Sequence, residues 1–212
     1  MSFTVEEALR EGNLLVKRKR YLEALECFQH VVSKDKRNLQ GLQSSAICLR
    51  HLGRHQEAIA PYTRYIALEK DLDELAAACF FLAKCYVITK RYKKALGMLN
   101  KALRLKKGRF AEAWLEKAQI YYNHLDKPGD ALACCRRAKK HGLGDSMNEP
   151  IKICKLAKKA KPGVFQTIRQ GLAGPRRSDA GPRWDDPLGG ESLTRWYHDE
   201  ESRRARDNLP GR

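Results

Sequence analysis

Apolar and polar residues alternate along the first two-thirds of the chain with the spacing of paired amphipathic helices. Four stretches align with one another, and they begin at Val5, Leu39, Ala76 and Ala111, which places their starts 34, 37 and 35 residues apart. Each stretch contains two helix-length patterns around a short polar turn. Self-similarity at this period predicts a repeat protein made of helical hairpins.

Small residues recur at matching places in the four stretches, where they let antiparallel helices approach closely. The eighth place of each first helix holds Gly12, Ala46, Ala83 and Ala118, and a fixed place in each second helix holds Ala24, Ala58, Ala95 and Ala131. Larger residues lie one turn away on the same helical face. This pattern predicts that the two helices of each stretch pack against each other.

Local signals mark where helices begin and end. Thr4 with Glu7 has the spacing of a capping box. Gly53 follows an apolar run, where a left-handed residue ends a helix, and Pro128 is suited to the first turn of the next helix. One further amphipathic helix is predicted over residues 146–160, where it would cover the stacking face of the last repeat.

Several motifs resemble the tetratricopeptide repeat family over about residues 5–141. The first stretch has an A-x-x-x-G-N start at Ala8 and a Y-x-E-A-L run at Tyr21, and Trp114 is the large early residue of the fourth stretch. The resemblance implies an all-α fold, a right-handed α-solenoid of about four helix pairs. The repeats would cover residues 5–38, 39–75, 76–110 and 111–144, within a domain of residues 1–160.

Charge and composition change near residue 161. The whole chain has a formal net charge of +17 in 212 residues. Residues 1–160 carry 32 basic and 17 acidic residues, whereas residues 161–212 carry 10 and 8. The second segment is rich in Arg, Gly and Pro, and we expect it to be a largely disordered tail with a possible short helix over 191–207. This segment would dock in the chain's own groove or in a partner, and the alternative is an unstructured spacer.

The residues that usually carry catalysis or bind metals do not form a recognisable pattern. The seven cysteines contain no C-x-x-C pair and have no histidine at zinc-finger spacing. We therefore predict buried structural thiols, because free cysteine packs as a small apolar side chain. His51 and His55 are separated by the turn at Gly53. We predict no enzyme activity, no cofactor and no metal site.

The resemblance implies that the first helices line a concave groove that binds partners. The partner-binding residues would be Leu9, Asn13, Lys17, Gln43, Ile47, Arg50, Phe80, Lys84, Val87, Leu115, Gln119 and Tyr122. Four of these are apolar in places where a groove without a ligand could be polar: Phe80, Val87, Leu115 and Tyr122. They indicate a site for an extended peptide or an amphipathic helix. The alternative is that Phe80 and Val87 pack between helices.

Chaperone-binding members of this family hold an acidic C-terminal peptide with a clamp of Lys, Asn, Asn, Lys and Arg. Here Asn13 matches one position, but the other four hold Leu9, Ser44, Ala77 and Phe81. A clamp for two carboxylates needs several converging donors. We therefore expect no binding of Hsp70 or Hsp90 through such a clamp.

Basic runs define a second candidate surface. This basic patch comprises Lys17, Arg18, Lys19, Arg20, Lys106, Lys107, Arg109, Arg136, Arg137, Lys139 and Lys140. Such charge favours RNA or other polyanions, although a solvated surface has the same composition.

The sequence as a whole predicts a non-enzymatic adaptor or scaffold for another protein. The alternative function is a basic repeat protein that binds RNA or a ribonucleoprotein. The longest apolar run, residues 75–83, is too short for a membrane span. We expect a cytoplasmic protein, and the run from Lys17 to Arg20 would also suit nuclear import.

Overall fold

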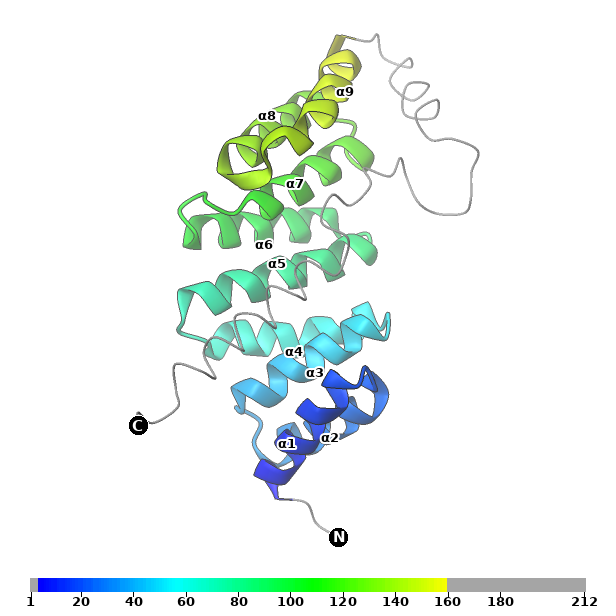
Figure 1. Ribbon diagram of the computed structural model, residues 1–212, viewed down its shortest axis with the longest axis vertical. Coiled ribbons are helices and arrows are strands. Elements are labelled where there is room, and N and C mark those ends of the chain that lie inside the picture. Colours follow the sequence, from blue (N-terminus) through cyan, green and yellow to red (C-terminus); the bar gives the residue numbers. More distant parts are fainter. Residues whose placement is uncertain (1–3, 160–212) are drawn as a thin grey trace. The chain divides into compact units, whose positions relative to one another are not determined.

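The computed structural model of this chain describes residues 4–159, which form helices joined by short turns (Figure 1). The helices are α1 (Val5–Lys17), α2 (Tyr21–Lys34), α3 (Leu39–His51), α4 (His55–Leu68), α5 (Leu72–Ile88), α6 (Tyr92–Leu105), α7 (Ala111–Asn123), α8 (Pro128–Ala138) and α9 (Asn148–Lys159). A π-helical turn (Lys139–Leu143) and a 3-10 turn (Gly144–Met147) join α8 to α9. The predicted tail over 161–212 lies outside the described residues.

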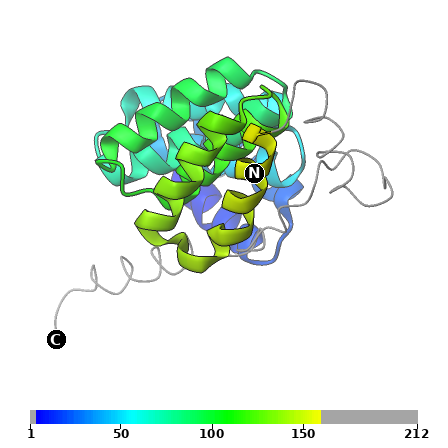
Figure 2. The same cartoon turned by 90° about the horizontal axis from the view of Figure 1, so that it is seen from above.

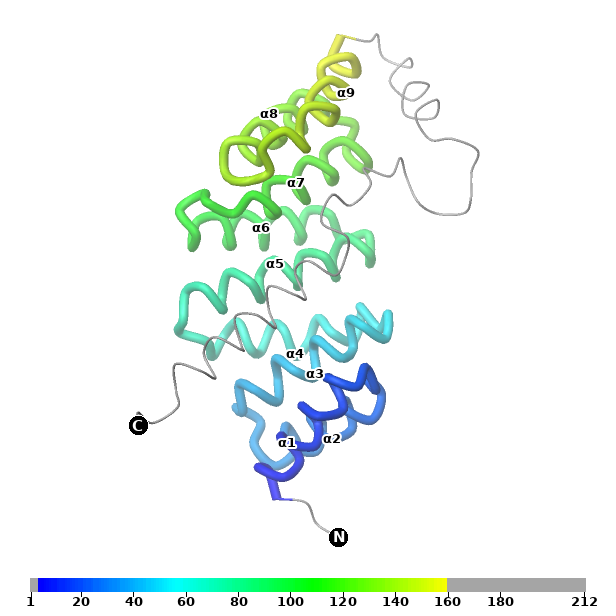
Figure 3. The backbone as a smooth tube through the Cα atoms, in the orientation of Figure 1, coloured from blue at the N-terminus to red at the C-terminus, as the bar shows by residue number. Residues whose placement is uncertain are grey.

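Successive helices pair into antiparallel hairpins, and the hairpins stack in chain order. Helix α1 packs on α2, α3 on α4, α5 on α6 and α7 on α8, while α2–α3, α4–α5 and α6–α7 connect neighbouring hairpins. Figure 3 follows this path, and Figure 2 looks down the stack, with the blue first hairpin behind the green later ones. The described residues contain no strand. The predicted all-α solenoid of four helix pairs is therefore confirmed.

The small residues lie where the two helices of each hairpin meet. All seven recurring alanines are completely buried. Gly12 is buried as well, and a Cβ atom at this position would lie 2.7 Å from Cε1 of Phe28. Phe28 lies in α2 and is itself completely buried. In the first hairpin, the two helices therefore pack with the Phe28 ring directly against Gly12.

Each turn between the first and second helix of a hairpin contains one residue in the left-handed conformation. Gly53 has φ +73°, as predicted, but the equivalent turns use Lys19 (φ 60°), Lys90 (φ 59°) and Asp126 (φ 51°). These residues lack the freedom of glycine. The turn geometry is therefore imposed by packing of the helices and is visible in the sequence only at Gly53.

The other local signals also hold in the structure. The Thr4 hydroxyl accepts a hydrogen bond from the backbone of Glu7, whose carboxylate accepts one from the backbone of Thr4, which is a capping box. Pro128 is the first residue of α8. Helix α9 begins two residues after the predicted start of the capping helix. The chain consists of two compact units, and the boundary between them lies inside α9, between Cys154 and Lys155. The predicted domain boundary at residue 160 stays a prediction.

Helix α5 is longer than its counterparts. The extra residues between the second and third repeats form an additional first turn, which begins after the N-cap Asp71. A carboxylate oxygen of Asp71 accepts hydrogen bonds from the backbone of Asp73 and Glu74, each at 2.9 Å. Every residue from Ala76 to Ala83 is buried. None of the described helices is long and apolar enough to cross a membrane.

Candidate interaction surface

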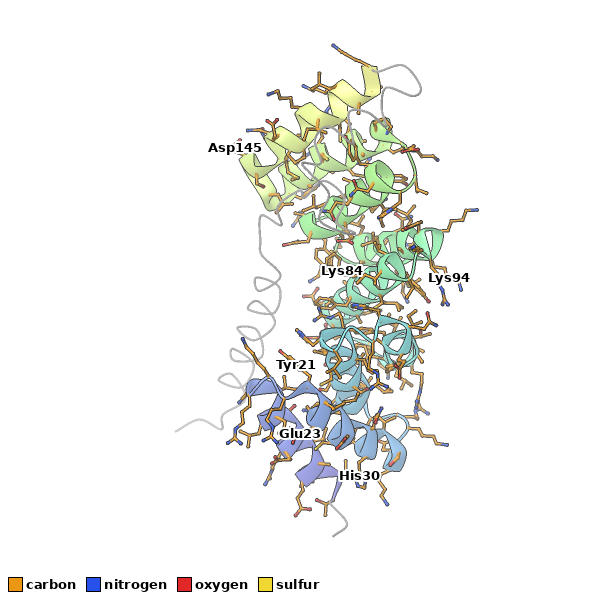
Figure 4. The ribbon with its side chains drawn as sticks, turned by 90° about the vertical axis from the view of Figure 1, so that its right-hand side faces the viewer. Tyr21, Glu23, His30, Lys84, Lys94 and Asp145 are labelled. Carbon is orange, nitrogen blue, oxygen red and sulfur yellow. The ribbon has the colours of Figure 1, made fainter. Side chains whose placement is uncertain are left out.

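The hairpins present two different surfaces. We call the surface formed by α1, α3, α5 and α7 the first-helix face, and the surface formed by α2, α4, α6 and α8 the second-helix face. In Figure 4, Lys94 of α6 projects from the right-hand edge of the third hairpin, whereas Lys84 of α5 lies toward the other edge. The predicted partner-binding residues all belong to the first-helix face.

Most of the predicted partner-binding residues retain access to solvent. Lys17 is exposed. Eight others are half-buried: Leu9, Asn13, Gln43, Ile47, Arg50, Lys84, Val87 and Gln119. They lie on all four first helices. The first-helix face therefore presents a mixture of polar and apolar side chains that are accessible to solvent.

The prediction that Phe80, Leu115 and Tyr122 are exposed groove residues is wrong. Phe80 is 2% exposed, Leu115 8% and Tyr122 0%. The Phe80 ring lies 5.6 Å from the ring of Phe81 and 5.1 Å from that of Phe110, which precedes α7. Phe80 thus joins the third hairpin to the fourth, which is the packing alternative considered for it.

Two cations lie over the phenylalanine rings of α5. The guanidinium carbon of Arg50, from α3, is 4.7 Å from the centre of the Phe81 ring. The ammonium group of Lys84 is 5.8 Å from the centre of the Phe80 ring. Cations at these distances are attracted to the faces of aromatic rings. In the sequence, Phe81 stands out only as a mismatch to the carboxylate clamp, and its contact with Arg50 is apparent only from the fold.

Polar contacts continue this surface between α3 and α5. The Gln43 amide donates a hydrogen bond to the Glu74 carboxylate at 3.1 Å. Beneath Arg50, burial raises the pKa of the Tyr62 hydroxyl to about 12. Burial, followed by the charge of Arg50, lowers the pKa of His55. The second and third hairpins are therefore connected by side-chain contacts between α3 and α5, among which Arg50 is the main charged group.

The predicted basic patch is not one surface. Its first run, Lys17 to Arg20, belongs to the first hairpin. Lys106, Lys107 and Arg109 lie between α6 and α7, and the remaining members lie in the last turn of α8 and the segment after it. Figure 1 shows these hairpins at different levels of the stack. Some members already have partners: Arg20 pairs with Glu23, Lys106 with Asp73 at 2.6 Å, and Lys139 with Asp145 at 3.3 Å.

The cysteines fit the prediction of structural thiols. Six are buried and Cys27 is half-buried. Burial raises the pKa of Cys48 to about 12 and that of Cys79, Cys85 and Cys134 to about 11. Thiols with such pKa values hold little of the nucleophilic thiolate at neutral pH. Within residues 4–159 no group of three or more metal-binding side chains comes together.

Antiparallel helical hairpins stacked in chain order define an α-solenoid, a class of repeat proteins in which each unit contacts only its neighbours. Two models of the tetratricopeptide repeat match the chain, one over residues 9–73 and the other over residues 76–108. Residues 9–73 and 76–108 of this protein are therefore tetratricopeptide repeats.

Several solved structures share this fold. The chain is similar to MamA from Desulfovibrio magneticus RS-1 (15% identity, TM-score 0.65, covering 95% of this chain and 98% of that one). It is similar to YrrB, a tetratricopeptide repeat protein with an unusual peptide-binding site (14%, 0.62, 79% and 84%). A chain of the Cut9–Hcn1 hetero-tetramer is 20% identical (0.61, 71% and 30%). The comparison with curated proteins gives no match.

Proposed function

We propose that this protein is a non-enzymatic adaptor that binds a peptide or an amphipathic helix of another protein on its first-helix face. Proteins with tetratricopeptide repeats serve as protein-interaction modules, and YrrB is described by its peptide-binding site. The observation that carries the proposal is the pair of cations over the α5 phenylalanine rings, Arg50 over Phe81 and Lys84 over Phe80.

The chemistry of this region indicates the kind of segment that it binds. Arg50 and Lys84 are half-buried, and their positive charges would attract a carboxylate on this face. Ile47 and Val87 are half-buried and apolar, and Ile88 is 54% exposed. A segment with acidic side chains beside aliphatic or aromatic ones would satisfy both sets of groups. The expected ligand is therefore an acidic, amphipathic segment.

Peptide selection tests this proposal. Immobilised full-length protein is used to select binders from a random 12-residue phage library, and the enriched peptides are measured by fluorescence anisotropy at 150 mM salt. We expect enrichment of peptides that combine Asp or Glu with large apolar residues. Lys84→Glu should weaken their binding at least tenfold, because it replaces an attractive charge with a repulsive one.

The matched control is Lys94→Glu, the same charge reversal on the second-helix face of the same hairpin. Charges more than about 8 Å from the peptide are screened at this salt concentration, so this variant should change affinity less than threefold. Circular dichroism establishes that both variants remain helical. Equal losses in the two variants, or no loss in either, would contradict a site on the first-helix face. Phe80→Arg does not test it, because Phe80 is buried.

RNA or ribonucleoprotein binding is a second candidate function. It is supported by a different observation, the concentration of positive charge in the second half of the described chain, and it uses the other face of the molecule. The two functions are compatible, because a ligand on one face leaves the other face open. Absence of Hsp70 and Hsp90 binding through a carboxylate clamp stays a prediction.

A further inference from the structure

Positive charge is unevenly distributed along the solenoid. Residues 89–143, which contain α6, α7 and α8, hold 15 lysines and arginines against 4 aspartates and glutamates, a net charge of +11. Residues 4–88 hold 13 against 11, a net charge of +2. Like charges at this density repel one another within the folded chain and attract polyanions to it. The third and fourth hairpins are therefore the part of the stack that a polyanion would contact.

Helix α6 has no carboxylate and presents a row of cations to solvent. Lys93, Lys94 and Arg104 are exposed, and Lys101 is half-buried. At a rise of about 1.5 Å per residue, the row extends over about 16 Å. None of these four side chains forms an ion pair with another described residue. The charge of this row is thus not neutralised within residues 4–159.

A buried ammonium group lies beside this row, where α6, α7 and α8 meet. Lys117 of α7 is only 8% exposed, and its Nζ donates a hydrogen bond to Oδ1 of Asn100, on α6, at 2.7 Å. It lies 4.9 Å from the centre of the Trp114 ring. The guanidinium carbon of Arg137, from α8, is 4.6 Å from the same ring. The charged groups of Lys117 and Arg137 therefore both lie against the indole ring of Trp114.

No carboxylate of the described residues forms an ion pair with Lys117. Its direct partner is the neutral amide of Asn100, and Asp130 acts on it only at longer range. Burial lowers the pKa of Lys117, and the charge of Arg137 lowers it further. A buried charge without a counter-charge is unfavourable. An anion that reached this place would therefore be stabilised by both cations.

We propose that the second-helix face of the third and fourth hairpins binds the phosphate backbone of RNA. Lys117 belongs to α7 but donates its hydrogen bond to Asn100 of α6, and together with Asn100 and Arg137 it would hold one phosphate group. This proposal rests on the second candidate function and names its site. Phosphate oxygens accept hydrogen bonds from the ammonium and guanidinium groups, and the α6 row contacts neighbouring phosphates of the same strand. Asn100 is exposed, so its amide can turn from Lys117 to the ligand.

RNA fits this surface better than an anionic membrane does. Peripheral attachment to a bilayer usually combines charge with exposed apolar side chains. The large apolar side chains that are exposed in the described residues are Leu14, Leu22, Leu39, Leu72, Ile88 and Leu156. None of them lies on α6, α7 or α8. The surface offers an excess of cations without exposed large apolar side chains, which is the requirement of a phosphodiester chain.

The first experiment measures binding of full-length protein to a fluorescein-labelled 20-nucleotide oligouridine RNA by anisotropy between 50 and 200 mM salt. The α6 variant carries Lys93→Ala, Lys94→Ala, Lys101→Ala and Arg104→Ala. Its affinity should fall at least tenfold. The slope of log K against log salt should become less steep by about 2 to 3, because each lost phosphate contact to a single strand contributes about 0.7.

A matched variant removes the same number of charges from the first half of the chain, at Lys34, Lys36, Arg37 and Lys70, all of them exposed. This control should lose less than threefold in affinity. Equal losses in the two variants would leave RNA binding standing but would overturn the site. If the wild-type protein binds no RNA at 50 mM salt, both the proposed RNA-binding function and the proposed site are wrong.

The second experiment tests the phosphate-holding group with Asn100→Asp. The new carboxylate supplies Lys117 with a counter-charge inside the protein, so thermal stability should rise and RNA affinity should fall at least fivefold. Lys94→Met makes the same change in net charge on the same helix, and it should reduce affinity by no more than half as much. If Asn100→Asp changes stability but not affinity, then Lys117 has only a structural role.

Two competitors complete the test. Vesicles of 70% phosphatidylcholine and 30% phosphatidylserine, and a 20-residue polyglutamate peptide, are added to the RNA complex. Neither should displace the RNA at equal charge concentration. Tighter binding of the vesicles or of polyglutamate through the α6 row would overturn the assignment to RNA.

Discussion

At the level of single residues, glycines at different positions of this protein have different structural roles. Gly12 and Gly97 both lie within helices, yet only Gly12 faces a neighbour. A Cβ atom at Gly12 would meet Cε1 and Cζ of Phe28 at 2.7 and 2.8 Å, whereas nothing lies within 4 Å of a Cβ atom at Gly97. The first glycine is required by packing, and the second is tolerated at a cost in helix stability.

These two glycines form a matched pair of substitutions. Gly12→Ala should lower the free energy of unfolding, because overpacking costs about 1–3 kcal/mol, more than the roughly 1 kcal/mol that alanine gains in helix propensity. Gly97→Ala should raise it by about 0.5–1 kcal/mol. Urea denaturation followed by circular dichroism measures both. Stabilisation by Gly12→Ala would mean that the Phe28 ring moves aside easily.

The exposure of individual residues in the candidate site could not be predicted from the sequence. The membership of Phe80 in a first helix followed from its place in the repeat. Its burial did not, because its ring contacts Phe110, which lies 30 positions later in the chain. Spacing along one helix defines a face, but the neighbour that covers this face belongs to another hairpin. Exposure of the partner-binding residues therefore had to come from the structure.

At the level of elements, the helix ends that were predicted correctly carry a local signal in the sequence. Thr4, Gly53 and Pro128 each carry a signal that acts within a few residues, and all three hold in the structure. In the sequence, the added turn of α5 is visible only as the longer interval of 37 residues between the starts of the second and third stretches. Asp71 begins this turn by accepting two backbone hydrogen bonds. An aspartate at such a position is a sequence signal, and here it identifies a helix that starts one turn early.

We predict that Asp71→Ala will destabilise the protein by about 1 kcal/mol, the usual cost of removing an N-cap side chain. Arg54→Ala is the control, since Arg54 is the N-cap of α4 but makes no capping hydrogen bond. Arg54 does pair with Glu57, but both side chains are exposed to solvent, and exposed ion pairs contribute little to stability. Equal losses in denaturation experiments would show that the Asp71 cap is unimportant.

At the scale of the whole molecule, the stack distributes stability unevenly. Helix α5 lies between α4 and α6, and its residues from Ala76 to Ala83 are all buried. Helix α1 begins the stack and buries only Ala8, Gly12 and Leu15. Because each repeat is supported by its neighbours, an end unit should open more often than an inner one.

Hydrogen exchange followed by mass spectrometry measures this difference directly. Backbone amides of α5 should exchange most slowly among the described helices, and those of α1 should exchange at least tenfold faster. Asp71→Ala should accelerate exchange only in the first turn of α5. Uniform protection from α1 to α8 would instead mean that the solenoid unfolds as a single cooperative unit.

The number of hairpins, the order of their helices and several helix ends could all be predicted from the sequence. Those features depend on the spacing of apolar and small residues and on caps, which act over a few positions of the chain. Only the tertiary structure decided which side chains remain accessible and which charges meet. The burial of Phe80, the position of Arg50 over Phe81 and the gathering of Asn100, Lys117 and Arg137 each involve different helices. Such contacts exist only after the hairpins have stacked.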